Sequence, residues 1–335
     1  MNEKISAGIF TFLLILYFPL GINTLTVLYV NPSTIITSVG DTFSVNITIS
    51  GVNDLGGWEF KLYYLSSNLN GTDLVQGPFL KQGGSTYFEI IDFTDNYNST
   101  HGIAWVTCAL LGAGPGVDGN GTLAVITFKA QQLGTSGLSL TDTLLSDSQP
   151  IPHIALNGIV HVLPHDVAIT DLTLSKTVVG QGLTVKMDVN ISDQGNFTET
   201  FNVTVYANLT SFATQTITLT SGNSTTSTFT WNTTGFAKGN YTISAYAWPV
   251  QGETHTADNN YTYSQKIIVT LAGDFDGDGF VYVDDLNIFG RAWYTREGDP
   301  YYNPLCDFDG DGFIYLDELD VFGRNWYKHA TNGEP

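Results

Sequence analysis

The chain has few positive charges and almost no cysteine. Its 335 residues include 12 Lys and Arg against 32 Asp and Glu, so its formal net charge is −20. This deficit argues against binding to nucleic acid or to anionic membrane surfaces, because both partners attract basic side chains. The two cysteines, Cys108 and Cys306, do not provide a disulfide framework. We expect each to be a small buried residue rather than a reactive thiol.

Charged side chains of either sign are scarce over most of the sequence. Residues 272–335 contain 14 acidic and 4 basic side chains, a net of −10 and therefore half of the total. The remainder is rich in Thr, Ser, Asn, Gly and β-branched residues, which favours β-sheet over helix. The length allows two or three domains. We predict a mainly β protein, with two β-sandwich domains followed by a small α-helical segment.

An acidic motif occurs twice in that last segment. It reads DFDGDGFVYVDDLNIFGRAWY from Asp274 and DFDGDGFIYLDELDVFGRNWY from Asp307, with 15 of 21 positions identical. A calcium loop of about twelve residues takes oxygen ligands from fixed positions and needs a glycine at its sixth. Both copies match this spacing and predict two Ca²⁺ ions. The predicted ligands are the side chains of Asp274, Asp276, Asp278 and Asp285 with the carbonyl of Phe280, then those of Asp307, Asp309, Asp311 and Glu318 with the carbonyl of Phe313.

Each loop is followed by apolar residues at helical spacing, which are Leu286, Phe289 and Trp293 in the first copy and Leu319, Phe322 and Trp326 in the second. The segment QKIIVTLAG before the first loop reads as a strand and a turn, so the entering helix of an EF-hand is missing. Two tandem loop-helix units over residues 272–330 resemble the type I dockerin of cellulosome-like systems, which take part in polysaccharide breakdown. Position 9 of the loops departs from that family. It is Tyr282 and Tyr315, and since a phenol is a poor calcium ligand we expect water there.

The dockerin resemblance implies a partner and a docking face. Dockerins plug into cohesin domains, so we expect a cohesin domain of another chain or of a second copy as partner. The resemblance places the docking face at loop positions 10 and 11 and on the helices that follow. These residues are Val283, Asp284 and Arg291 in the first repeat, and Leu316, Asp317 and Arg324 in the second. Because the repeats are nearly identical, two docking orientations are expected.

The N-terminal end reads as an export signal. Lys4 is followed by an apolar centre between Ile9 and Phe18, so residues 1–24 are interpreted as a signal peptide, with an uncleaved N-terminal anchor as the alternative. Twelve N-x-S/T sequons support a secreted or cell-surface protein. Those predicted to face solvent on alternating strands, and so to be glycosylated, are Asn46, Asn190, Asn202 and Asn240. Residues 331–335 are assigned to a tail.

Residues 25–163 alternate between apolar and polar side chains, as in Phe43, Val45, Ile47 and Ile49. The pattern VGDTFSVNITISG, followed by WEFKLYY, GTLAVITFKA and NGIVHV, resembles a cohesin or a cohesin-like carbohydrate-binding sandwich. Trp58 and Trp105 are candidates for a sugar-stacking platform. We expect both in the core instead, because each lies in an otherwise apolar strand.

Residues 164–271 show the same alternation, with Leu183, Val185, Met187, Val189 and Ile191 in one run. Turn signals such as DQGN, SGN and AKGN separate the runs, as in an immunoglobulin-like sandwich. The order DVAITDLTL, VGQGLTVKMDVNISDQGN, TFTWNT and GNYTISAYA resembles CARDB-type adhesion modules. That resemblance implies a spacer or adhesive stalk.

Catalytic residues are not evident. The densest group of carboxylates outside the repeat is Glu59, Glu89, Asp92 and Asp95, and a surface role fits these residues better than a glycosidase pair. The mixed spacing of His153, His161 and His165 argues against a metal site and for strand-end surface residues. We therefore expect a non-catalytic extracellular assembly protein. The alternative is a carbohydrate-binding adhesion protein, with a polysaccharide as partner, tethered to a scaffold through its dockerin.

Overall fold

A computed structural model describes residues 25–112 and 114–330. The predicted signal at residues 1–24 and the tail at 331–335 lie outside the described residues. The chain divides into two compact units, the first formed mainly by residues up to Val160 and the second mainly by residues from His161 onward. Strands dominate both units, and the mainly β prediction is confirmed. No helix in the described part of the chain is long and apolar enough to cross a membrane.

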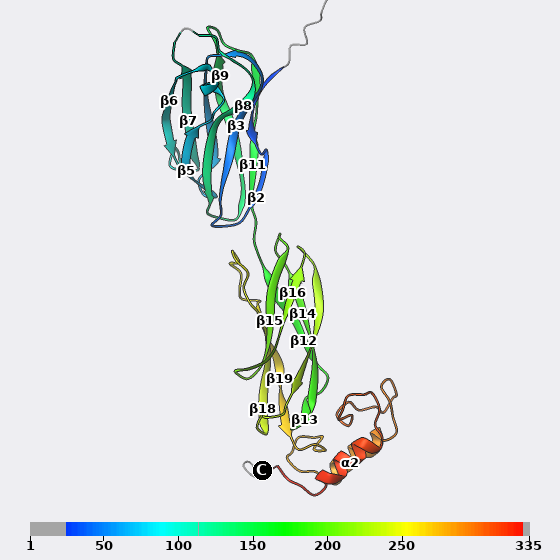
Figure 1. Cartoon of the computed structure of the whole chain (residues 1–335). Coiled ribbons are helices and arrows are strands. Elements are labelled where there is room, and N and C mark those ends of the chain that lie inside the picture. Colours follow the sequence, from blue (N-terminus) through cyan, green and yellow to red (C-terminus); the bar gives the residue numbers. More distant parts are fainter. Residues whose placement is uncertain (1–24, 113, 331–335) are drawn as a thin grey trace, which may run out of the picture. The chain divides into compact units, whose positions relative to one another are not determined.

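The first unit contains a β-sandwich. One of its sheets has the strand order β10-β1-β3-β8-β5 and the other the order β2-β11-β9-β4-β7-β6 (Figure 1). Its strands are β1 (Thr26–Asn31), β2 (Thr34–Thr37), β3 (Thr42–Leu55), β4 (Gly57–Leu65), β5 (Leu69–Gln76), β6 (Thr86–Thr94), β7 (His101–Leu110), β8 (Val117–Ala130), β9 (Gly134–Ser146), β10 (His153–Leu156) and β11 (Gly158–Val162), with a 3-10 helix at Leu80–Gly83.

Alternation along β3 and β4 builds the core of this sandwich. Val45, Ile47 and Ile49 are fully buried, as predicted. Trp58 on β4 is buried against Phe60, with ring centroids 5.5 Å apart. Trp105 on β7 does not join the core, contrary to the prediction. It alternates with two buried neighbours, so its half-buried ring lies on the outer phase of the strand.

The second sandwich begins at β12. Its sheets have the orders β12-β14-β17 and β13-β19-β18-β15-β16 (Figure 1). Its strands are β12 (Val167–Leu174), β13 (Val178–Gly180), β14 (Thr184–Asp193), β15 (Glu199–Ala207), β16 (Thr210–Leu219), β17 (Ser224–Asn232), β18 (Gly239–Ala247) and β19 (Asn260–Thr270).

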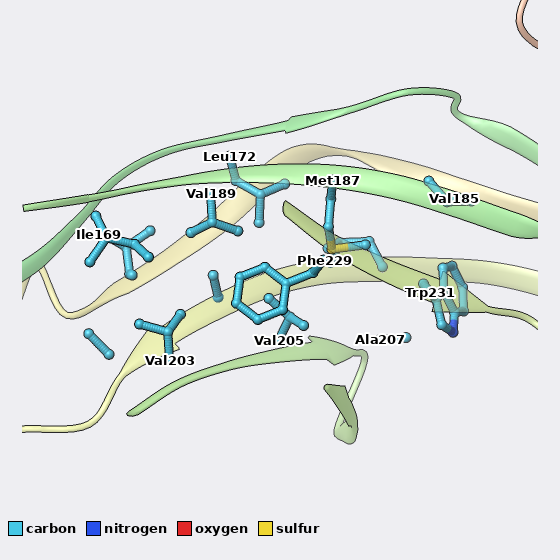
Figure 2. Packing of buried hydrophobic residues seen from close by; sticks show 14 of the residues in the cluster. Ile169, Leu172, Val185, Met187, Val189, Val203, Val205, Ala207, Phe229 and Trp231 are labelled. Atoms are coloured by element: carbon cyan, nitrogen blue, oxygen red, sulfur yellow. The ribbon is translucent and has the colours of Figure 1, made fainter. Parts of the chain in front are cut away.

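Apolar side chains from both sheets fill the space between them. Figure 2 shows Val189 and Met187 of β14 facing Val203 and Val205 of β15, with the aromatic rings of β17 among them. Trp231 is fully buried and packs against three further rings, those of Phe212, Phe236 and Tyr241. Period-two burial is what a strand covered on one face requires.

Two helices, α1 (Val283–Ala292) and α2 (Leu316–Asn325), follow β19. Their buried faces differ from the predicted apolar stripe. Phe289 and Phe322 are buried, but Leu286 and Leu319 are 43% and 40% exposed. The carboxylates at loop position 12, Asp285 and Glu318, directly precede these leucines and take the inward positions that the leucines were expected to occupy. Cys306 is buried in the same segment and Cys108 in the first sandwich, and both are free, as predicted.

Replacing Trp231 tests the packing of the second sandwich. We expect Trp231→Ala to lower its free energy of unfolding by about 3–5 kcal/mol, because removing a buried ring leaves a cavity. The matched control is Trp248→Ala, where the side chain is 51% exposed and the loss should be about 1 kcal/mol or less. Urea unfolding of the full chain measures both. Equal losses would show that Trp231 does not organise this core.

Candidate metal centre

The first acidic loop starts directly after the second sandwich. β19 ends at Thr270, and Asp274 is 2% exposed. Its carboxylate accepts hydrogen bonds from the backbone N–H groups of Gly277 and Gly279, both at 2.8 Å, and from the Thr270 hydroxyl. Gly277 and Gly279 have φ of 77° and 94°, values that other residues rarely adopt. These glycines let the chain curl around one carboxylate.

The second loop repeats this arrangement around Asp307. The backbone N–H groups of Gly310 and Gly312 donate to its carboxylate at 2.6 and 3.1 Å. The Tyr302 hydroxyl takes the place of the Thr270 hydroxyl, at 2.6 Å. In addition, the Lys176 ammonium of the second sandwich donates to the Asp307 carbonyl oxygen at 2.9 Å. The side chain of Lys176 therefore places a positive charge beside the second loop.

The carboxylates at loop position 12 close each loop onto its helix. Asp285 is buried and accepts hydrogen bonds from the N–H groups of Phe275 and Tyr282 at 2.7 and 3.0 Å. Glu318 is also buried and accepts from the N–H of Tyr315 at 2.9 Å. Each reaches back to the residue before its helix, as in one half of a capping box. The same side chain thus begins the helix and faces the loop.

The structure brings the predicted side-chain ligands of positions 1, 3 and 5 together in both repeats. In each trio one carboxylate oxygen per residue lies within 4.8 Å of the others, in Asp274, Asp276 and Asp278 and in Asp307, Asp309 and Asp311. A further group joins Asp309, Asp317 and Glu318. Asp317 was predicted only as a docking residue. Its carboxylate also belongs to the acidic cluster, and its adjacency to Glu318 was the available signal.

Burial makes these carboxylates costly to ionise. It raises the pKa of Asp274, Asp285 and Asp309 above the usual range. Burial also raises the pKa of Glu318 to about 7, and a hydrogen bond with Asp317 adds to the rise. Several carboxylates around one point repel one another until a cation binds. The clusters can hold metal ions, and their all-oxygen donors suit a hard divalent cation.

The two repeats are held together by reciprocal backbone hydrogen bonds. Val281, in the first loop, accepts from the N–H of Tyr327 and donates to the carbonyl of Lys328, both at 3.0 Å. Ile314, the matching residue of the second loop, is bonded in the same way to Tyr294 and Thr295. Each loop is therefore braced by the chain that leaves the other repeat's helix. The sequence gives no local sign of this exchange.

Stacked phenylalanines lie under the two loops. Phe275 is nearly parallel to Phe289, Phe308 and Phe322, with ring centroids 5.8–6.2 Å away. Leu183 of the second sandwich also packs against this cluster, as do Leu271 and Ala272, which follow β19. The core of the repeat is small and is completed by side chains of the preceding sandwich.

The tyrosines at position 9 form part of an exposed aromatic surface. Tyr282 stacks on Phe280 at 5.4 Å, and Tyr327 packs edge-on against it. Phe313, Tyr315 and Tyr294 form the matching set in the other repeat. Tyr294 and Tyr327 have φ of 63° and 65° at the ends of the helices. Position 9 thus supplies packing surface, a role that was not predicted.

The predicted docking residues lie at the surface of the repeat. Val283 is 66% exposed and Leu316 73% exposed, at equivalent places in α1 and α2. Asp284, Arg291 and Asp317 are exposed as well. Arg324 is exposed and forms an ion pair with Asp320 one helical turn earlier. The two copies of the face are therefore presented alike.

The remaining predicted sites lie in the sandwiches. Asn202 and Asn240 are exposed, whereas Asn46 and Asn190 are half-buried between the inward residues of β3 and β14. The three histidines considered as ligands lie apart and have other partners. His153 bonds to Thr143, His161 to Thr135, and His165 to Glu199 while stacking on Phe197.

Two glycine substitutions separate loop geometry from helix stability. A Cβ at Gly279 would meet nothing closer than 3.8 Å, so the cost of Gly279→Ala is conformational, about 1–2 kcal/mol at this positive φ. The control is Gly290→Ala inside α1, where space is open and stability should rise by up to about 1 kcal/mol. Native-state hydrogen exchange of α1 reports both changes. The two substitutions should change the stability of α1 in opposite directions. An increase in stability for Gly279→Ala would contradict the loop geometry.

Comparisons with known families identify both sandwiches. A model of the cohesin domain matches residues 30–162, and the CARDB model matches residues 165–265. No curated protein matches the chain in sequence. The solution structure of CaCohA2 from Clostridium acetobutylicum is similar at 24% identity, covering 42% of this chain and 92% of that one, with a TM-score of 0.33.

Two further solved structures illustrate the similarity. A type I cohesin–dockerin complex from Clostridium thermocellum has 15% identity over 41% of this chain and 93% of that chain, with a TM-score of 0.34. A CARDB domain from Pyrococcus furiosus, in complex with di-metal ions, has 24% identity over 32% of this chain and 94% of that chain, with a TM-score of 0.27. The chain thus contains a cohesin domain followed by a CARDB domain, and the paired acidic repeat comes after both.

Proposed function

We propose that this protein is a non-catalytic extracellular assembly protein, with a receptor domain at one end and a calcium-ordered dockerin at the other. The observation that carries the proposal is the combination of a cohesin domain at residues 30–162 with two interlocked acidic loop-helix repeats after Thr270. A cohesin domain implies a role in cohesin–dockerin assembly, and CARDB points to an adhesion-type module. Both matched modules are non-catalytic.

Calcium is the cation that we assign to the repeat. Its donors would be the trios around Asp274 and Asp307, the carboxylates at position 12, and the carbonyls of Phe280 and Phe313. Oxygen donors in this number favour calcium, because it accepts six to eight of them at flexible geometry. The ion would supply the positive charge that compensates the buried carboxylates. Its role here is structural, holding α1 and α2 and their surface residues in place.

The docking face is proposed on the exposed residues at the start of α1 and α2. Val283 and Leu316 offer apolar surface, flanked by Asp284 and Asp317. The reciprocal bracing of the two loops relates these faces by a pseudo-twofold, so either repeat can present the same chemistry. The partner would be a cohesin domain. If it belongs to a second copy, the contact is heterologous and leads to rings or open filaments.

A second candidate function is carbohydrate binding by the first sandwich. It is favoured by Trp105, which lies half-buried on the outer phase of β7 rather than in the core. Its indole N–H donates to Glu59 at 2.7 Å, and the Lys61 ammonium lies 4.3 Å from the ring centroid. Tyr97 adds exposed aromatic surface by packing on Tyr63 of the neighbouring strand β4. Such surfaces stack on sugar rings, and a polysaccharide would then be the partner.

Removal of calcium tests the structural role of the ion. With EDTA we expect fast hydrogen exchange throughout residues 272–330, because the clustered carboxylates repel one another without a cation. Calcium at about a hundred times its dissociation constant would raise the free energy of unfolding of the repeat by about 2.7 kcal/mol per site. Peptides from β14 and β17 serve as internal controls, since their hydrogen bonds need no ion. Unchanged exchange in the repeat after chelation would contradict the assignment.

A capture experiment on the full chain tests the function. The immobilised chain should bind an isolated type I dockerin more tightly than soluble polysaccharides, and its own repeat should bind an isolated type I cohesin in a calcium-dependent way. Two equivalent docking modes predict that Val283→Asp or Leu316→Asp alone weakens cohesin binding only about twofold, while the double variant abolishes it.

Leu209→Asp is the matched control for that experiment, because Leu209 is 97% exposed in the turn between β15 and β16 of the second sandwich. It should leave cohesin binding unchanged. Complete loss of binding from either single variant would contradict two equivalent modes. Binding of polysaccharide alone, reduced by Trp105→Ala, would support the second candidate instead.

A further inference from the structure

The loop between β18 and β19 is fixed across the start of β12. One oxygen of the Glu253 carboxylate accepts from the N–H of Val167 at 3.0 Å, and the other accepts from the N–H of Val250 at 2.9 Å. Farther along the loop, the Asp258 carbonyl accepts from the N–H of Ile169 at 2.9 Å. The loop is therefore attached to β12 on both sides of residue 255. This attachment holds the intervening histidine beside the residue that precedes β12.

Three donor atoms converge at that point. The Nδ1 atom of His255 lies 3.5 Å from Oδ1 of Asp166 and 3.2 Å from Oδ1 of Asp258. All three atoms lie within 4.8 Å of one another. The two carboxylate oxygens are closed off from solvent and accept no hydrogen bond. Buried polar atoms without a partner are rare in proteins, so these two need an explanation.

The spacing of the donors is that of ligands around a small divalent ion. Zinc binds imidazole nitrogen and carboxylate oxygen at about 2.1 Å, which places tetrahedral neighbours about 3.4 Å apart. The observed nitrogen–oxygen separations of 3.5 and 3.2 Å bracket that value. An imidazole among the donors also distinguishes this cluster from the repeat. Calcium takes oxygen ligands, whereas imidazole suits zinc and related transition metals.

The surrounding charge favours a cation. Asp193 is fully buried near Asp166, and one of its carboxylate oxygens also accepts no hydrogen bond. Burial raises the pKa of Asp193, and the charges of Glu199 and Asp166 add to the rise. Within residues 25–112 and 114–330, no Lys or Arg forms an ion pair with any of these carboxylates. The His255 side chain is 62% exposed, so the imidazole donor can be reached from solvent.

We propose that Asp166, His255 and Asp258 form a binding site for a divalent transition-metal ion of the zinc type. The ion would join the β18–β19 loop to the first residue before β12 and so fix one end of the second sandwich. This site is separate from the acidic repeat in sequence, in donor chemistry and in metal preference. It does not rest on the assignment of a dockerin.

Zinc binding by the full chain tests this inference. With calcium kept in large excess, calorimetric titration with Zn²⁺ should give one tight site per chain. His255→Ala and Asp258→Asn should each weaken it more than about tenfold, since even residues that only support ligands contribute that much. His101→Ala, which removes a histidine of the first sandwich, should bind zinc as the unaltered chain does. Zinc should also slow hydrogen exchange in residues 249–259 of the unaltered chain but not of His255→Ala.

Two results would overturn the inference. One is the absence of zinc binding by the unaltered chain when calcium is in large excess. The other is equal zinc affinity in His255→Ala, which would place the ion elsewhere. Either result would leave His255 in simple ion pairs with Asp166 and Asp258. That outcome would explain the buried oxygens without a metal.

Discussion

The burial of carboxylates is the constraint on which the C-terminal repeat depends. Asp274, Asp285, Asp307 and Glu318 are each no more than 3% exposed, in a segment whose apolar core is small. Backbone N–H groups and hydroxyls satisfy several of their oxygens, but neutral donors do not cancel the charge. A bound cation would cancel it, and the energy it supplies would fix the loops, the helix starts and the outward residues together. Surface presentation would then depend directly on ion binding in this segment.

The two sandwiches differ from the repeat, because each buries a large apolar core between its sheets. Their strands alternate inward and outward residues, and rings such as Trp231 fill the interior. The CARDB domain also contacts the repeat. Leu183 packs against the core of the repeat, and Lys176 donates a hydrogen bond to the carbonyl of Asp307. The repeat is thus supported by its neighbour as well as by its own residues. The CARDB domain thus contributes to the fold of the segment that follows it.

Features set by short stretches of chain were predictable from the sequence. The loop carboxylates, the glycine at position 6 and the alternation along β3 and β14 follow from local spacing. Features that join distant residues were not predictable. Trp105 was assigned to the core because apolar neighbours do not reveal which phase of a strand is buried. His255 and Asp258 stand at a ligand-like spacing, but Asp166 reaches them only through the attachment of a loop to β12. Leu286 was expected inside, where the carboxylate of Asp285 lies instead.

The reciprocal bracing of Val281 and Ile314 has a consequence for how the two ions are bound. Ordering of the first loop fixes the chain that leaves α2, and ordering of the second fixes the chain that leaves α1. The first of two bound ions would therefore meet part of the ordering cost of the other site, and the second would bind to a chain that is already partly organised. Loading should be positively cooperative, with few molecules holding a single ion. With calcium as the proposed ion, the repeat would then be a threshold element, either fully assembled or open, as the surrounding calcium concentration changes.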